Sequence, residues 1–215
     1  MSNQSAPELL VLHAVRLIGY ADTDAVAARA GTDSGETLRL LHEAERAGWV
    51  QHLAFADLGG WSLTDAGKTE NERQLAAERK HADPENTIAA VYRAFLPLNA
   101  RLVRAVTDWQ IRPTDTDQFA PNDHSDRSWD SRILDELTTL GAELAPLADR
   151  LSGVLPRFDG YTDRYVAALS RAIRGEHSWI DTTDVDSCHR VWFQLHEDLI
   201  ATLGVDRYAE KPGDF

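Results

Sequence analysis

The sequence predicts a mainly helical protein that carries one small β-hairpin near its N-terminus. Apolar residues recur at three- and four-residue spacing through most of the chain, as they do on the buried faces of helices. Residues 49–63 interrupt this pattern with β-rich runs that flank a turn containing two glycines. With 215 residues, of which 43% are hydrophobic and 27% charged, the chain is long enough for two cores. We therefore expect two domains, residues 1–82 and 83–215.

Three short helices are predicted before the hairpin. The first ends at Gly19, and Asp22 or Thr23 can cap the second. The third follows Asp33, whose side chain is spaced to accept a hydrogen bond from the amide three residues later, and it closes at Gly48. Two short helices joined by a tight turn that contains glycine make a helix-turn-helix.

The hairpin is predicted from two β-rich runs, residues 49–55 and 61–63, with turn residues between them. Thr64 can then cap a fourth helix that continues to about residue 80. The first domain therefore has the order helix, helix, helix, hairpin, helix.

This order resembles the winged helix-turn-helix of bacterial regulators of the MarR and PadR kind. The likeness lies mainly in the stretch from Thr37 through Val50, which closes in A-G-W-V, and in the later L-T-x-A-G. It covers the N-terminal third of the chain. The resemblance implies a DNA-binding fold whose third helix enters the major groove while the hairpin, or wing, meets the flanking backbone or minor groove.

By its position in that fold, the third helix would direct its N-terminal side chains toward double-stranded DNA. Arg39 could read guanine or hold a phosphate, Ser34 could bind a phosphate, and His42 could do either. The residues that the resemblance places at the DNA are Ser34, Gly35, Glu36, Leu38, Arg39, His42 and Arg46.

The charge of the chain supports an alternative of another class. The net charge is −13, and the wing segment 51–60 contains no Lys or Arg. Because phosphate neutralisation supplies most non-specific affinity, any DNA contact must come from a small local patch. The alternative is a winged-helix-derived protein that no longer binds DNA and acts as a small-molecule-binding protein, an enzyme or an interaction adaptor. An adaptor would dock through apolar side chains of the third helix and the wing: Leu38, Leu40, Leu53, Phe55 and Leu58.

The second domain is predicted to be a bundle of four or five helices. Asp83 and Pro84 predict an N-cap followed by proline at the first helical position, and Pro97 predicts a kink or a break in the helix that follows. Ser128 and Asp186 are expected to cap two later helices.

Aromatic residues gather in this second domain. One interpretation is a packed core, since large rings bury much area. The other is a pocket between helices for a small hydrophobic or aromatic ligand. The candidate ligand-binding residues are Trp109, Trp129, Tyr161, Tyr165, Trp179, Trp192 and His196.

No catalytic residue, metal site or cofactor is predicted. Cys188 is the one cysteine, which excludes an intramolecular disulfide and a cysteine-based metal cage. His189 and His196 are two helical turns apart, too far to ligate one metal together. The longest apolar runs are far shorter than a membrane span, and the N-terminal MSNQSAPE lacks the cationic start and apolar stretch of a signal peptide. We therefore expect a cytoplasmic protein.

These observations favour a ligand-responsive transcriptional regulator. It would bind DNA as a homodimer, because a two-fold operator needs two recognition helices. A ligand in the helical domain would change the separation of the two DNA-binding parts.

Overall fold

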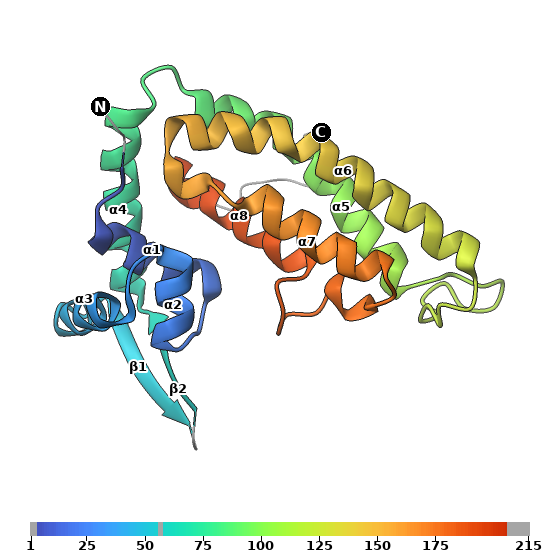
Figure 1. Ribbon diagram of the computed structural model, residues 1–215, viewed down its shortest axis with the longest axis horizontal. Coiled ribbons are helices and arrows are strands. Elements are labelled where there is room, and N and C mark those ends of the chain that lie inside the picture. The colour runs from blue at the N-terminus through green and yellow to red at the C-terminus, as the bar shows by residue number, and fades with distance from the viewer. Residues whose placement is uncertain (1–3, 56–57, 206–215) are drawn as a thin grey trace. The chain divides into compact units, whose positions relative to one another are not determined.

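The computed structural model describes residues 4–55 and 58–205 (Figure 1). Residues 56–57 in the predicted hairpin turn and residues 206–215 at the end of the second predicted domain lie outside the described residues. The described chain is mainly helical with one small antiparallel sheet, as the sequence predicted. Its elements are α1 (Pro7–Ile18), α2 (Thr23–Ala30), α3 (Ser34–Arg46), β1 (Val50–Phe55), β2 (Leu58–Leu63), α4 (Asp65–Ala82), α5 (Thr87–Gln110), α6 (Arg127–Val154), the 3-10 helix η1 (Pro156–Phe158), α7 (Tyr161–Ile173), the 3-10 helix η2 (His177–Trp179) and α8 (Cys188–Leu203).

The described residues form two compact units. The first contains residues 4–86, 154–157 and 197–205, and the second contains 87–153 and 158–196. The first unit thus includes two later segments, residues 154–157 and 197–205. A single division between residues 82 and 83 would place both in the second domain. Residues 197–205 belong to the first unit because they pack against it: Ala201 of α8 is buried in one cluster with Leu9 of α1 and Leu75 of α4.

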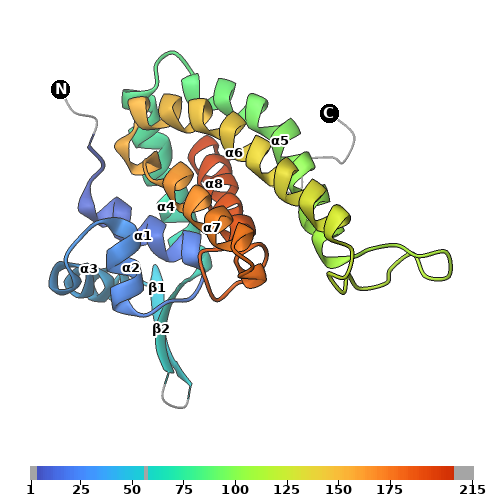
Figure 2. The same cartoon turned by 45° about the vertical axis from the view of Figure 1, so that its right-hand side comes forward.

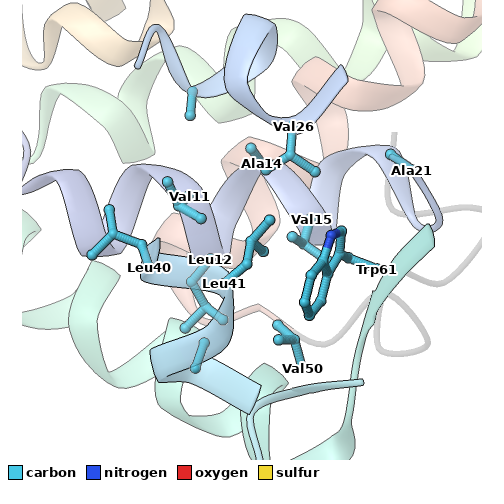
Figure 3. Packing of buried hydrophobic residues seen from close by; sticks show 12 residues of the cluster. Val11, Leu12, Ala14, Val15, Ala21, Val26, Leu40, Leu41, Val50 and Trp61 are labelled. Carbon is cyan, nitrogen blue, oxygen red and sulfur yellow. The ribbon is translucent and has the colours of Figure 1, made fainter. Parts of the chain in front are cut away.

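The main core of the first unit joins α1, α2, α3 and both strands (Figure 3). Val15, Val26, Leu41 and Trp61 come from four different elements and are each at most 3% exposed. Full burial of a side chain of this size contributes about 1.5–3 kcal/mol to folding. The buried cluster consists of Val11, Leu12, Ala14, Val15, Ala21, Val26, Ala30, Leu40, Leu41, Ala44, Val50 and Trp61.

The hairpin is fastened to the start of α2. Its strands are antiparallel, with Val50 opposite Leu63. Trp61 exchanges backbone hydrogen bonds with Ala21, at 2.7 and 3.2 Å, and its indole Nε1 donates to Thr23 Oγ1 at 3.1 Å. The position of β2 relative to α2 is therefore set by backbone and side-chain contacts together.

α4 approaches the hairpin closely through a glycine. Thr64 caps the helix as predicted, because its Oγ1 accepts from the amide of Gly67 at 3.0 Å. A Cβ atom on Gly67 would lie only 1.8 Å from the carbonyl oxygen of Trp49. Glycine is therefore required where α4 crosses the start of β1.

In the second unit α5 and α6 run side by side and antiparallel (Figures 1 and 2). Arg101 of α5 bonds to Glu136 of α6, whereas Asp108, later in α5, accepts from Trp129, earlier in α6. Of the kink or break predicted at Pro97, the break does not occur, because Pro97 lies within a single continuous helix. Among the described residues, none of the helices is long and apolar enough to cross a membrane.

The prediction that Asp83 is the N-cap of the long helix α5 is wrong. Asp83 follows the last turn of α4, where its amide donates to the carbonyl of Arg79, and α5 begins only at Thr87. The physical reason is Pro84, which disfavours helical dihedrals in the preceding residue and so ends α4.

Two further predicted caps are also wrong. At the start of α6 the capping oxygen belongs to Asp126, which accepts from the amides of Ser128 and Trp129 at 3.0 and 3.1 Å. At the start of α8 Ser187 Oγ accepts from the amide of Arg190, while Asp186 bonds to the guanidinium of Arg164. In each case the capping residue lies one or two positions from the predicted one, and side-chain geometry decides which oxygen reaches the free amides.

Candidate functional site

Six of the seven residues that the resemblance places at the DNA lie on one exposed side of α3. Their helical spacing places them within the same half of the helix circumference. Thr37, Leu40, Leu41 and Ala44 on the opposite side are buried in the unit. Glu36, which the resemblance also placed at the DNA, is half-buried. We define the α3 face as the exposed residues Ser34, Gly35, Leu38, Arg39, His42 and Arg46.

The N-terminal end of the α3 face is tightly organised. The carboxylate of Asp33 accepts from the amide of Glu36 at 2.9 Å, as the sequence predicted. Ser34 Oγ donates to Asp24 Oδ1 at 2.7 Å, which links the start of α3 to α2. A helix N-terminus attracts anions through its free amides, but here two carboxylates already lie beside it. A phosphate would have to approach past Asp24 and Asp33.

The cations of the α3 face have partners on α3 itself. Arg39 Nη1 donates to Glu43 Oε1 at 2.7 Å, and Arg39 Nη2 lies 3.7 Å from Glu36 Oε1. His42 Nδ1 lies 3.4 Å from Glu45 Oε2. Arg46 Nε donates to the carbonyl oxygen of His42 at 3.3 Å. These contacts are exposed to solvent, where an ion pair contributes at most about 1 kcal/mol.

A buried tryptophan connects the α3 face to the hairpin. The ring of Trp61 lies edge-on to His42 of α3, at 5.4 Å between centroids, and tilted against His52 of β1 at 4.6 Å. His52 is exposed, and the sequence analysis did not select it. The wing segment 51–60 has no Lys or Arg, so His52 is its one basic side chain. Its pairing with Trp61 across the strands is the signal that could have identified it.

The aromatic residues chosen as ligand contacts lie in separate places within the second unit. Tyr165 and Trp192 are in contact, at 5.6 Å between ring centroids, whereas Trp109 packs against His124 and His177. Trp179 is covered by the guanidinium of Arg171 at 3.9 Å. The set is therefore not gathered around one common site.

Most of these rings belong to the packed interior. Trp109, Tyr161, Tyr165 and Trp192 are at most 2% exposed, and His196 is 8% exposed. The polar atoms of the rings have partners inside the unit: Tyr165 Oη donates to the carbonyl of Leu137, and Trp192 Nε1 donates to Asn99 Oδ1. This is the arrangement expected of core aromatics.

Trp129 differs from the other predicted ligand residues because it lines a cleft. The cleft has a volume of about 260 Å³ and lies along α5 and α6. Each helix contributes four residues at the same spacing, so one stripe of α5 faces one stripe of α6. We define the α5–α6 cleft as the space lined by Arg101, Arg104, Ala105, Asp108, Trp129, Arg132, Ile133 and Glu136. The sequence analysis missed its arginines, although they fall on the faces that carry Ala105 and Ile133.

The first unit contains a buried charge cluster that the sequence analysis also missed. His13 Nε2 of α1 lies 3.0 Å from Asp198 Oδ1 of α8, and His13 Nδ1 contacts Asn71 Oδ1 of α4 at 3.2 Å. Arg157 bonds to Asp198 and, through Nε, to Glu78 of α4 at 2.9 Å. A polar residue within an apolar stripe, as His13 is within that of α1, is the sequence signal for such a cluster.

In this cluster, burial and the neighbouring charges shift the pKa values in opposite directions. Burial lowers the pKa of His13 despite the nearby Asp198. Burial alone would raise the pKa of Asp198, but Arg157 and His13 outweigh it and hold that pKa below its usual range. Burial likewise acts to lower the pKa of Arg157, and the carboxylates of Asp198 and Glu78 raise it overall. The cluster therefore fastens the last turns of α8 to α1 and α4.

Nucleophilic and metal chemistry have little support among the described residues. Burial raises the pKa of the Cys188 thiol to about 12, so the thiolate is scarce at neutral pH. No group of three or more His, Cys, Asp or Glu side chains in the described chain is placed to hold a metal ion.

Comparison of the chain with protein-family models, with curated proteins and with solved structures found no match. The functional argument therefore rests on the α3 face and on the α5–α6 cleft.

Proposed function

We propose that the protein is a transcriptional regulator that binds double-stranded DNA through a winged helix-turn-helix made of α1–α3, the hairpin and the start of α4. The observation that carries the proposal is the α3 face. Its members are exposed together on α3, the second helix of the proposed helix-turn-helix, while the other side of α3 is buried. That is the placement a recognition helix needs.

In this proposal α3 enters the major groove with its N-terminal half. Arg39 is the cation best placed to meet a guanine edge or a phosphate, because it is 55% exposed and its ion pairs are surface pairs. On contact with DNA, Arg39 would leave its ion pairs with Glu43 and Glu36 and bind phosphates instead. The hairpin follows the flanking backbone, where the exposed ring of His52 can donate a hydrogen bond to a phosphate.

Recognition of a two-fold DNA site requires two copies of the chain, so the proposed active form is a homodimer in the cytoplasm. A small ligand bound by the helical unit would change the preferred arrangement of the two copies, and with it the affinity for DNA.

One observation favours a second candidate function, a winged-helix-derived protein that no longer binds DNA. Arg39 is engaged by two glutamates, and the wing segment 51–60 has no Lys or Arg. Such a protein would act through small-molecule or protein binding. Of the apolar adaptor residues, Leu38 and Leu53 are exposed, at 40% and 47%, whereas Leu40 is buried at 3%. The side chains of Phe55 and Leu58 lie outside the described residues.

An electrophoretic mobility shift on random and promoter DNA at two salt concentrations separates the two candidates. The regulator should bind DNA with an affinity that falls as salt rises, because bound phosphates release counterions. Arg39→Glu should abolish binding. Arg150→Glu, which makes the same charge change at an exposed site on α6, should leave it nearly unchanged.

The second candidate predicts no salt-dependent shift with any DNA. Equal binding by the wild type and Arg39→Glu would also reject the regulator, because the α3 face would then not carry the interaction. Circular dichroism of each variant checks that the helical content is retained.

A further inference from the structure

We propose that two copies of the chain associate by exchanging loops, so that Phe119 of each copy inserts into the α5–α6 cleft of the other. The homodimer rests on the proposed function, whereas the contact between Phe119 and the cleft does not depend on DNA binding. The exchanged loop is residues 111–126, which join α5 to α6 and extend beyond the ends of both helices (Figures 1 and 2).

An aromatic side chain of this loop projects into solvent. Phe119 is 78% exposed, the highest fraction among the exposed large apolar side chains of the described residues. A phenyl ring in water forgoes the free energy of burial. Aromatic side chains that fill a pocket on a partner are the usual anchors of protein interfaces.

The backbone of the loop holds Phe119 in this exposed position. The amide of Arg112 donates to the carbonyl oxygen of Ala120 at 2.9 Å, which closes the base of the loop. Nearer the tip, the amide of Phe119 itself donates to Asp117 Oδ1 at 2.8 Å. An anchor whose backbone is already ordered loses less conformational entropy on association.

The α5–α6 cleft suits a phenyl ring in size and lining. Its volume is about 260 Å³, and a cavity of about 150 Å³ is enough to hold benzene. Ala105 and Ile133 are 4% and 5% exposed and supply apolar surface. The indole Nε1 of Trp129 donates to the carbonyl oxygen of Asp108 at 2.8 Å, which fixes that ring. A second aromatic ring can therefore pack against Trp129.

Charge favours the loop as the occupant of the cleft. Residues 113–123 contain three Asp and no Lys or Arg, whereas three Arg, one Asp and one Glu line the cleft. Arg101 pairs with Glu136 at 2.8 Å. Within the described part of the chain, Arg104 and Arg132 have no ion pair. An acidic loop thus meets a cleft with an excess of positive charge, which favours this pairing over others.

The position of the cleft explains why the loop comes from a second copy. Phe119 does not line the cleft of its own chain. The cleft is formed by the last turns of α5 and the first turns of α6, which lead directly into and out of the loop. Two α5–α6 hairpins that overlap at their tips therefore bring each loop to the cleft of the other. A single two-fold axis generates both contacts.

Sedimentation equilibrium of the full chain in the absence of DNA tests this association. The wild type should form dimers. Phe119→Asp should weaken dimer formation by about tenfold or more, as loss of a central aromatic anchor does. Arg132→Glu should also weaken it, because the cleft would then repel the acidic loop. Circular dichroism and thermal melting of each variant check that the fold is kept.

Two control variants match these substitutions. Val166→Asp places the same charge on an exposed apolar position of α7, and Arg93→Glu makes the same reversal on α5 outside the cleft. Both should associate like the wild type. Loop exchange is overturned by a monomeric wild type, by a dimer that Phe119→Asp and Arg132→Glu leave unchanged, or by equal losses in the controls.

Mixing the two defective variants tests the exchange itself. In a mixed dimer of Phe119→Asp and Arg132→Glu, the intact loop of one chain meets the intact cleft of the other, and the second contact carries both substitutions. Native mass spectrometry should therefore show mixed dimers in preference to dimers of either variant alone. A mixture that associates no more tightly than its components overturns the exchange of loops.

DNA binding is measured separately. A wild type that forms dimers through Phe119 but shifts no DNA upholds loop exchange, and the regulatory function fails. A wild type that binds DNA, with dimers that Phe119→Asp does not weaken, gives the reverse result.

Discussion

Arg39 and Glu43 lie one turn apart on α3, and the guanidinium of Arg39 donates to the carboxylate of Glu43 over 2.7 Å. Both side chains are about half exposed, at 55% and 45%. A phosphate that approaches Arg39 must therefore compete with a neighbouring carboxylate rather than with water alone. The cost of this competition is small, because exposed ion pairs of this kind contribute at most about 1 kcal/mol.

This pair gives the first prediction. Glu43→Gln should strengthen DNA binding by about twofold to fivefold, because it releases Arg39 and removes a negative charge from the α3 face. Fluorescence anisotropy with a labelled duplex measures the change.

Glu70→Gln is the control for this variant. Glu70 accepts from Arg73 on α4 at 2.8 Å, and its side chain is 15% exposed. Its substitution removes the same charge and should leave DNA affinity unchanged. Equal gains in both variants would show that net charge matters and the α3 face does not.

The second prediction concerns the crossing of α4 and β1. Gly67→Ala should destabilise the protein by about 2 kcal/mol or more, because the added Cβ would lie 1.8 Å from the carbonyl oxygen of Trp49. Chemical denaturation followed by circular dichroism measures the loss.

Gly153→Ala supplies the contrast. Gly153 lies near the end of α6, and a Cβ there would meet nothing within 4 Å. Because alanine favours helix over glycine, this variant should be neutral or stabilised by up to about 1 kcal/mol. A Gly67→Ala protein as stable as the Gly153→Ala protein would refute the close approach.

The third prediction follows from the buried charge cluster. Burial lowers the pKa of His13 in the folded state, whereas an unfolded histidine titrates near its ordinary value of about 6.5. The unfolded chain therefore takes up the proton first as the pH falls, and the free energy of unfolding should decrease between pH 7 and pH 5. Asp198, whose pKa is also lowered, adds a further loss only below about pH 4.

Denaturation curves at pH 7 and pH 5 test this dependence. His13→Gln should be less stable than the wild type at pH 7. Its free energy of unfolding should change less between pH 7 and pH 5. His81→Gln, at an exposed position of α4, should retain the wild-type change. A wild-type stability that is constant or rises toward pH 5 would contradict the assignment of a neutral, buried His13.

Much of the fold is predictable from the sequence because its signals are local. The caps at Asp33 and Thr64 depend on residues three positions apart, and both are confirmed. The cap at Asp83 is wrong although its pattern is local, because the same dipeptide can end one helix or begin the next. Here Pro84 ends α4, because it disfavours helical dihedrals at Asp83, and α5 begins only at Thr87.

The candidate site is predictable only in part. The residues of the α3 face follow from helical spacing, but the partners of Arg39 depend on rotamers that spacing alone does not fix. The buried cluster of His13, Arg157 and Asp198 joins three distant segments, so a local pattern cannot reveal it. The same holds for the α5–α6 cleft, whose lining depends on how α5 and α6 pair.

Selection of bound duplexes from a random DNA library tests the central claim most directly. The account predicts enrichment by the wild-type chain of a site with two inverted half-sites about 10 base pairs apart, as two α3 helices of a symmetric dimer require. Arg39→Glu should enrich no such site from the same library. A wild-type selection that yields no recurring sequence, or one that Arg39→Glu reproduces, would contradict DNA recognition by the α3 face.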